Sequence, residues 1–176
     1  MISPSGLARR LEAALKKLLA QDGDLFQCAI DGTDRISRKL HEVCVNHQLA
    51  NHLKDSLDPR FSREKLFYDI EFNKRGQEDK KLTVDGRQKS VRPDIVIHNR
   101  LNNDRKLNLL VIECKMATTR HKRIEWDRKK LLAFMQDDRF QYQYGLQVIY
   151  DTGRITAELY SRIGSKIEPK PITITR

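Results

Sequence analysis

Two apolar runs joined by a short polar segment constrain the fold of this chain more strongly than any other feature. They occupy residues 92–100 and 107–115, and the segment between them reads LNNDRK. Short runs rich in Val, Ile and Leu with polar boundaries are typical of buried β-strands. We therefore predict two neighbouring strands that fold back on each other as an antiparallel hairpin.

Helical and strand patterns surround this hairpin. In chain order, hydrophobic spacing predicts helices over residues 4–22 and about 34–57, a strand over 66–73, the two strands of the hairpin, a helix over about 124–138, and strands over about 142–150 and 154–160. The second helix should stop at Pro59, and Asp151-Thr152-Gly153 should turn between the last two strands. This order predicts an α/β protein with a mixed central sheet flanked by helices.

Two segments lack a clear period. Residues 74–89 are almost wholly charged or polar, and we expect a mobile connection there. Residues 162–176 contain two prolines and are expected to form a C-terminal tail. The 176 residues fit one domain, with an N-terminal helix over 4–22, a core over about 34–161 and the tail.

The composition favours a polyanionic partner. Lys and Arg number 34 against 24 Asp and Glu, which gives a formal net charge of +10. The cysteines Cys28, Cys44 and Cys114 form no CxxC pair, so we expect neither a disulfide framework nor a zinc cluster, and a reducing, cytoplasmic location fits best. No apolar stretch is long enough to span a membrane, and no membrane partner is expected.

The predicted hairpin brings charged residues together at its open end. A symmetric pairing sets Asp94 opposite Glu113 and Val96 opposite Val111, with Lys115 on the same face and Cys114 on the other. Two carboxylates about 5 Å apart repel by roughly 3 kcal/mol at an effective dielectric constant of 20. A cation should therefore accompany them, and oxygen ligands of this kind suit Mg²⁺. Phosphodiester hydrolysis is the chemistry that such a site supports.

Pro93-Asp94 followed by Glu113-Cys114-Lys115 resembles the motif of the PD-(D/E)XK nuclease superfamily. The resemblance covers about residues 34–150 and implies a restriction-endonuclease-like αβββαβ core preceded by an extra helix. It also implies that Asp94 and Glu113 bind Mg²⁺, for which Mn²⁺ could substitute, and that Lys115 is catalytic. A further acidic ligand would be Glu42, with Glu71 as the alternative. Nucleases of this kind often act as homodimers, and the first helix offers one interface.

Further basic residues follow the second strand of the hairpin. Arg120, Lys122, Arg123 and Lys130 are predicted to contact nucleic acid; without a catalytic site beside them, the first three would be interpreted as a solvated charge run. Asp127 and Lys130 either reach the same cleft or form a surface pair.

The prediction is a Mg²⁺-dependent DNA endonuclease. The alternatives are a non-catalytic nucleic-acid-binding or assembly module and an interaction domain for an acidic protein. If these residues have only structural roles, Asp94 binds a backbone amide at the start of a strand, Glu113 and Lys115 form an exposed cross-strand pair, and Glu42 pairs with Lys39 or Arg38.

Overall fold

A computed structural model describes residues 2–26, 42–61, 66–75, 78–99 and 107–176. These residues form an α/β protein in which three α-helices accompany a mixed six-stranded sheet. The elements are α1 (Pro4–Asp22), the 3₁₀ helix η1 (Gly23–Leu25), α2 (Glu42–Phe61), β1 (Phe67–Ile70), β2 (Lys74–Arg75), β3 (Glu78–Asp79), β4 (Lys81–Val84), β5 (Arg87–Ser90), β6 (Ile95–His98), β7 (Leu110–Met116), α3 (His121–Gln136), β8 (Tyr144–Asp151), β9 (Arg154–Ile163) and β10 (Lys166–Thr175).

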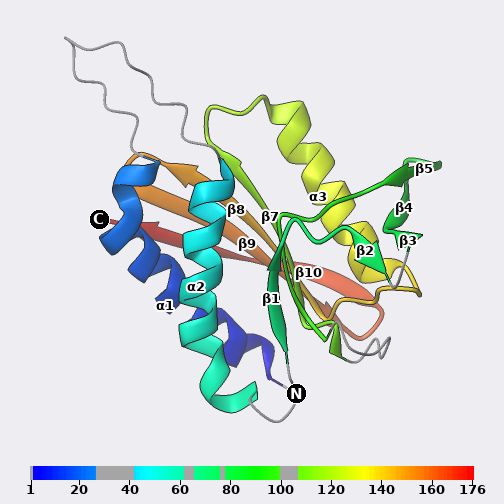
Figure 1. The fold of residues 1–176 in the computed structure, drawn as a ribbon, viewed down its shortest axis with the longest axis horizontal. Coiled ribbons are helices and arrows are strands. Elements are labelled where there is room, and N and C mark those ends of the chain that lie inside the picture. The colour runs from blue at the N-terminus through cyan, green and yellow to red at the C-terminus, as the bar shows by residue number, and fades with distance from the viewer. Residues whose placement is uncertain (1, 27–41, 62–65, 76–77, 100–106) are drawn as a thin grey trace.

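The central sheet has the strand order β1-β6-β7-β8-β9-β10. Strands β7 and β8 are parallel and joined through α3, whereas the other neighbours are antiparallel. Figure 1 shows α1 and α2 side by side on one face of this sheet, and α3 beyond the opposite face. The predicted mixed sheet with helices packed against it is confirmed.

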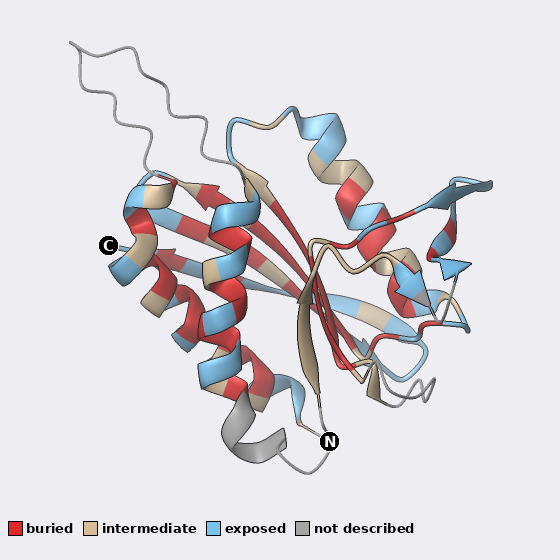
Figure 2. Cartoon of the chain, in the orientation of Figure 1, coloured by how far each residue is buried: buried red, intermediate tan, exposed pale blue. Residues whose placement is uncertain are grey.

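Each face of the sheet has its own hydrophobic core. The larger core lies under α1 and α2 and includes Ile95, Ile112 and Cys114. The smaller core lies under α3 and includes Val96 and Val111. Buried residues run along the central strands and along the sides of α1 and α2 that face the sheet (Figure 2). Successive strand residues therefore alternate between the two cores, which explains why β6 and most of β7 are buried continuously.

The pairing of the two apolar runs is as predicted. Ile95 lies opposite Ile112, and Val96 lies opposite Val111. Continuing this pairing by one position sets Asp94 opposite Glu113, on the face that α3 covers. The chain reversal between the strands lies outside the described residues.

The approach of α3 to the sheet depends on a glycine in β8. A Cβ atom at Gly145 would lie 2.3 Å from Leu131 Cδ2 and 2.9 Å from Met135 Sδ. Both residues are on the buried side of α3, which the sequence predicted from Leu131, Phe134 and Met135. Gly145 therefore sets the distance at which α3 packs on the strands.

The expectation of a structureless connection over residues 74–89 is wrong. β4 and β5 form a hairpin whose turn residues, Asp85 and Gly86, have φ angles of 50° and 72°. Asp-Gly is a preferred pair for a two-residue turn with positive φ angles. Leu82 and Val84 alternate with exposed residues and pack in the core under α3.

The expected irregular tail is also wrong, because β10 is a ten-residue strand at the edge of the sheet. Alternate residues of an antiparallel strand direct their N–H groups to the same side. Pro169 and Pro171 have no N–H group, and their shared row fits the side away from β9. An edge position therefore accommodates prolines that a central strand would exclude.

Helix boundaries differ by a few residues from those predicted. α2 continues through Pro59 to Phe61, since proline in the last turn removes only one intrahelical hydrogen bond. Residues 34–41 of the predicted second helix lie outside the described residues. α3 begins at His121, three residues earlier than expected. Glu71 has a φ angle of 51°, which ends the alternation of β1 and turns Phe72 into the core under α3.

Candidate active site

Asp94, Glu113 and Lys115 meet where β6 begins and β7 approaches its end. Asp94 Oδ2 accepts a 2.7 Å hydrogen bond from the Cys114 backbone N–H, which fixes the carboxylate across the two strands. Lys115 Nζ lies 3.6 Å from the same oxygen. Cys114 itself points into the larger core and is fully buried, as the alternation predicted.

Lys115 is the centre of one half of the site. Its Nζ atom lies 2.8 Å from Glu42 Oε1, 3.3 Å from Asp127 Oδ2 and 2.6 Å from the Cys114 carbonyl oxygen. Glu42 belongs to the first turn of α2, so a helix from the opposite side of the sheet contributes to the site.

Glu71, the alternative acidic residue, contacts a different group. One of its carboxylate oxygens lies 3.3 Å from the Arg92 guanidinium. Its backbone N–H donates to the Asp94 carbonyl oxygen at 2.9 Å, so Glu71 is a backbone neighbour of the site. Of the two proposed additional acids, Glu42 is the one that reaches Lys115.

Lys130 is the centre of the other half of the site. Its Nζ atom lies 2.6 Å from Glu113 Oε2 and 3.2 Å from Asp127 Oδ1. Its side chain is 11% exposed, which differs from the open phosphate contact that the sequence suggested. Asp127 joins the two halves, because its two oxygens face the two lysines. We call these six residues the carboxylate–lysine cluster: Glu42, Asp94, Glu113, Lys115, Asp127 and Lys130.

Asp127 is a member of the cluster to which the sequence assigned no definite role. It is buried in the second turn of α3, three residues before Lys130. The sequence does contain a signal for this position, because Asp127 and Lys130 lie on the same side of the helix as the apolar residues Leu131 and Phe134. A surface pair would lie on the opposite side of the helix.

The pKa values show how strongly burial and charge act on the cluster. Burial raises the pKa of Glu113 well above its usual range, against the attraction of Lys130 and with further upward contributions from Asp94 and Asp127. Burial also raises the pKa of Glu42, opposed by its hydrogen bond from Lys115. Burial alone would lower the pKa of both lysines, yet the surrounding carboxylates raise it, so both ammonium groups stay protonated.

The cluster has two features that fit a divalent cation. Four carboxylates face two ammonium groups, so the fully ionised cluster has a formal charge of −2. Glu113 is fully buried, and its Oε1 atom has no hydrogen-bond partner among the described residues. Mg²⁺ commonly takes only one or two protein carboxylates and keeps several waters.

The described residues do not, however, form a closed metal cage. No three Asp, Glu, His or Cys side chains in this part of the chain are arranged to hold one ion. An ion at the cluster would therefore rest on Asp94 and Glu113, with water and substrate oxygens as its remaining ligands.

Basic residues surround the start of α3. Arg120, Lys122 and Arg123 are exposed, as is His121 between them. Arg120 is the N-cap residue and makes no side-chain capping bond. Cations at the positive end of a helix are unfavourable unless an anion approaches, so the predicted phosphate contacts at these three positions stay a prediction.

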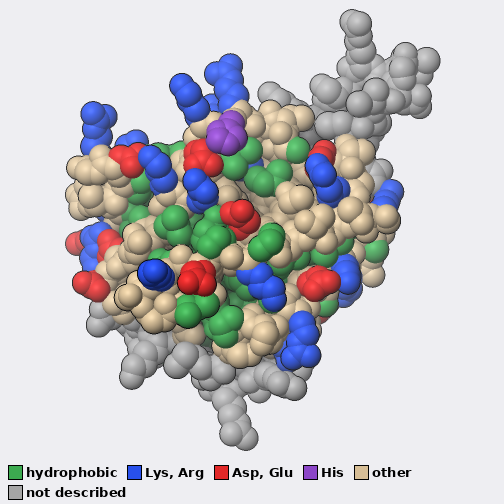
Figure 3. Space-filling view, turned by 180° about the vertical axis from the view of Figure 1, so that it is seen from behind, with side chains coloured by type: hydrophobic (Ala, Val, Ile, Leu, Met, Phe, Trp, Pro, Cys, Tyr) green, Lys and Arg blue, Asp and Glu red, His purple; other side chains and the backbone are tan. Residues whose placement is uncertain are grey.

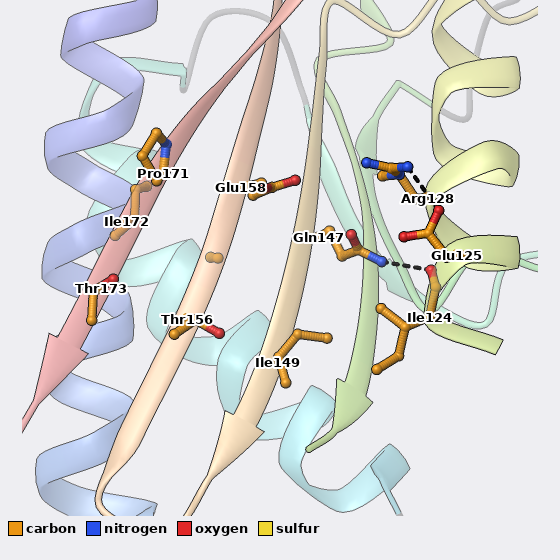
Figure 4. A pocket seen from close by; sticks show the side chains of 11 residues that line it. Ile124, Glu125, Arg128, Gln147, Ile149, Thr156, Glu158, Pro171, Ile172 and Thr173 are labelled. Carbon is orange, nitrogen blue, oxygen red and sulfur yellow. Dashed lines mark hydrogen bonds and ion pairs between the residues drawn. The ribbon is translucent and has the colours of Figure 1, made fainter. Parts of the chain in front are cut away.

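A groove runs beside the cluster, between α3 and the open face of β8, β9 and β10. Its volume is about 300 Å³. Gln147 lies in it next to Glu113 in the sheet and donates a 2.8 Å hydrogen bond to the Ile124 carbonyl oxygen (Figure 4). Glu125 and Glu158 also line it, against one Arg128. From behind, hydrophobic side chains gather near the middle of the molecule, with acidic and basic side chains scattered among and around them (Figure 3). The carboxylates and apolar side chains that line the groove do not favour the binding of a phosphate backbone there.

No known protein family, characterised protein or solved structure matches this chain. Among the described helices, none combines the length and apolar character needed to cross a membrane.

Proposed function

We propose that the protein is a metal-dependent nuclease of the PD-(D/E)XK type that hydrolyses phosphodiester bonds in DNA. In this proposal, α2, β1, β6, β7, α3 and β8 are the restriction-endonuclease-like αβββαβ core. Helix α1 and strands β9 and β10 extend that core on the side away from β1. The order and the mixed pairing of these elements support the assignment.

One observation carries the proposal. Glu42 from α2, Asp94 from the residue before β6 and Asp127 from α3 converge around the ammonium group of Lys115, and Glu113 occupies the adjoining buried position. Burying Glu113 and Asp127 and half-burying Glu42 and Asp94 beside them has a high cost in stability that a purely structural role does not explain. Groups under such strain commonly mark functional sites.

The proposed roles follow from the contacts. Asp94 and Glu113 would hold the cation, and Glu42 holds Lys115 through a 2.8 Å ion pair. A bound Mg²⁺ supplies Lewis-acid stabilisation of charge on a phosphoryl oxygen and lowers the pKa of a bound water. Lys115, held by Glu42 and Asp127, keeps its proton and offers a positive charge to the attacking water and to the developing negative charge.

The second candidate is a nucleic-acid-binding module without catalysis. The 2.6 Å ion pair between Lys130 and Glu113 favours it, because an ammonium group already neutralises the carboxylate that a metal would use. This candidate predicts salt-dependent DNA binding, and no heat of Mg²⁺ binding when the protein alone is titrated in a calorimeter.

A cleavage assay distinguishes the candidates. Supercoiled plasmid, linear DNA and RNA are incubated with the protein in Mg²⁺, in Mn²⁺ and in chelator. The variants are Asp94→Asn and Lys115→Met, and the matched control is Glu168→Gln on β10, which neutralises an exposed carboxylate far along the sheet from the cluster.

The nuclease proposal expects metal-dependent cutting of DNA that both site variants reduce by at least about 100-fold, the scale of losing one electrostatic contributor to catalysis. The control should cut like the wild type. Cutting that persists in chelator or in Asp94→Asn contradicts the mechanism. DNA binding without cutting under any metal condition supports the second candidate.

A further inference from the structure

The β4–β5 hairpin projects from the body of the protein beside α3, on the side away from α1 (Figure 1). Its inner face rests on α3 through Leu82 and Val84, and Lys89 Nζ lies 4.1 Å from the centre of the Trp126 ring. The strand register places Arg87 and Lys89 on this inner face, whereas the outer face presents the polar side chains of Lys81, Thr83, Gln88 and Ser90. Thr83 and Gln88 lie directly opposite each other there. All four residues of β5 are exposed.

The hairpin is held firmly at its base and near its tip. The Val91 N–H donates to the Lys80 carbonyl oxygen at 2.8 Å, which closes the base. Arg139 donates to the Lys81 carbonyl oxygen at 2.8 Å. At the tip, Lys129 Nζ lies 2.8 Å from Asp85 Oδ2. A ribbon anchored at both ends can present its side chains to a partner without first becoming ordered.

The surface chemistry of the hairpin points to a polyanion. Lys81, Arg87 and Lys89 are exposed cations, and the one carboxylate, on Asp85, is already neutralised by Lys129. The outer face exposes no large apolar side chain, so it lacks the anchors of a typical protein interface. The major groove of B-form DNA is wide enough to admit a two-stranded β-ribbon, and amide and hydroxyl side chains can bond to base edges there.

The hairpin is directly joined to the carboxylate–lysine cluster. Only Val91, Arg92 and Pro93 separate β5 from Asp94, and Lys130 Nζ contacts the Arg92 carbonyl oxygen at 3.4 Å. The position of the ribbon is therefore tied to that of the site.

We propose that the β4–β5 hairpin enters the major groove of duplex DNA and positions it for the carboxylate–lysine cluster. Lys81, on the outer face, and Arg87, next to the turn, contact phosphates, and Thr83 and Gln88 face the base edges. This inference rests on the proposed function, because it names the form of nucleic acid that the same site receives.

The test measures DNA binding in chelator, so that cleavage does not contribute. A labelled duplex of about 20 base pairs, a length that spans roughly two helical turns, is titrated by fluorescence anisotropy at several salt concentrations. The ribbon variant is Lys81→Ala with Arg87→Ala, which removes two exposed charges. The control is Arg9→Ala with Lys54→Ala, which removes two exposed charges from α1 and α2 on the other face of the sheet.

Each phosphate contact contributes about 0.9 to the slope of log K against log salt, so losing two contacts lowers the slope by nearly 2 and weakens binding roughly 60-fold at 0.1 M salt. We expect this loss for the ribbon variant, and a clearly smaller one for the control. Methylation of guanine N7, which lies in the major groove, should weaken binding by the wild type, whereas replacing guanine by inosine changes only the minor groove and should not.

Equal binding by the ribbon variant and the control overturns the inference, as does sensitivity to inosine rather than to N7 methylation. In either case, metal-dependent cutting by the wild type leaves the proposed nuclease function standing. A wild type that neither binds nor cuts DNA removes both proposals.

Discussion

Replacing Lys130 by methionine isolates the energetic role of the ion pair beneath the candidate site. Methionine keeps most of the apolar stem of Lys130 but removes the ammonium group 2.6 Å from Glu113 Oε2. Breaking a buried pair by removing one partner costs about 3–5 kcal/mol, because the remaining charge is left uncompensated. With a urea m value of about 2 kcal/mol per molar, the unfolding midpoint should fall by about 2 M.

The loss should depend on pH with a definite sign. The pKa of Glu113 is already raised by burial, and removing Lys130 takes away the largest influence that lowers it. Above the unfolded value of about 4.5, the unfolded chain has released this proton while the folded chain retains it, so stability falls as pH rises toward the folded pKa. Lys130→Met should therefore be weakened more at pH 8 than at pH 5.

Urea unfolding in chelator, followed by circular dichroism at both pH values, measures this effect. The double variant Lys130→Met with Glu113→Gln removes the uncompensated charge and should regain most of the lost stability. If Lys130→Met unfolds at the wild-type urea concentration at pH 8, or if the double variant is no more stable than the single one, the ion pair does not have the role assigned to it.

Two further predictions concern the packing of α3 at Gly145 and the burial of Lys80. Gly145→Ala should lower the free energy of unfolding by about 1–3 kcal/mol, because the added methyl group meets Leu131 and Met135; an unchanged midpoint in urea would mean that α3 moves away without cost. Burial lowers the pKa of Lys80 from 10.5 to about 8, so the unfolded chain binds the extra proton between these values and wild-type stability should rise with pH there, by up to about 3 kcal/mol. In urea unfolding at pH 7.5 and pH 10, the wild type should gain this stability at the higher pH and Lys80→Met should not. An equal change in the unfolding free energy of both proteins would contradict the prediction.

Hydrophobic periodicity was sufficient to predict the strands at the centre of the fold. The register of β6 and β7 was predicted from a symmetric reversal of the chain between the two apolar runs, because both faces of these strands are buried and hydrophobicity alone does not choose between them. The alternation of side chains along a strand separated Cys114 from Glu113 and Lys115. The hairpin before β6 is not apparent from hydrophobic periodicity, because its buried apolar residues are only Leu82 and Val84. The Asp85-Gly86 turn is the stronger signal there, although charged residues surround it.

Sequence patterns predicted the acids of β6 and β7 better than the lysine that accompanies them. Asp94 and Glu113 interrupt apolar runs, and a charged residue within an apolar run can be recognised from the sequence alone. The partner of Glu113 is Lys130, from a helix whose angle and depth depend on the close approach at Gly145. That contact is set by packing between layers, which spacing along the chain does not encode. For the same reason, the sequence could not choose between Glu42 and Glu71.

The prolines of β10 have a consequence for the behaviour of the protein in concentrated solution. An exposed sheet edge ordinarily offers an unbroken row of amide donors to any extended peptide that drifts against it. Here Pro169 and Pro171 leave two gaps in that row, near the middle of the strand. Stacking of one molecule onto the next through this edge, the first step toward fibrous aggregates, is thereby disfavoured.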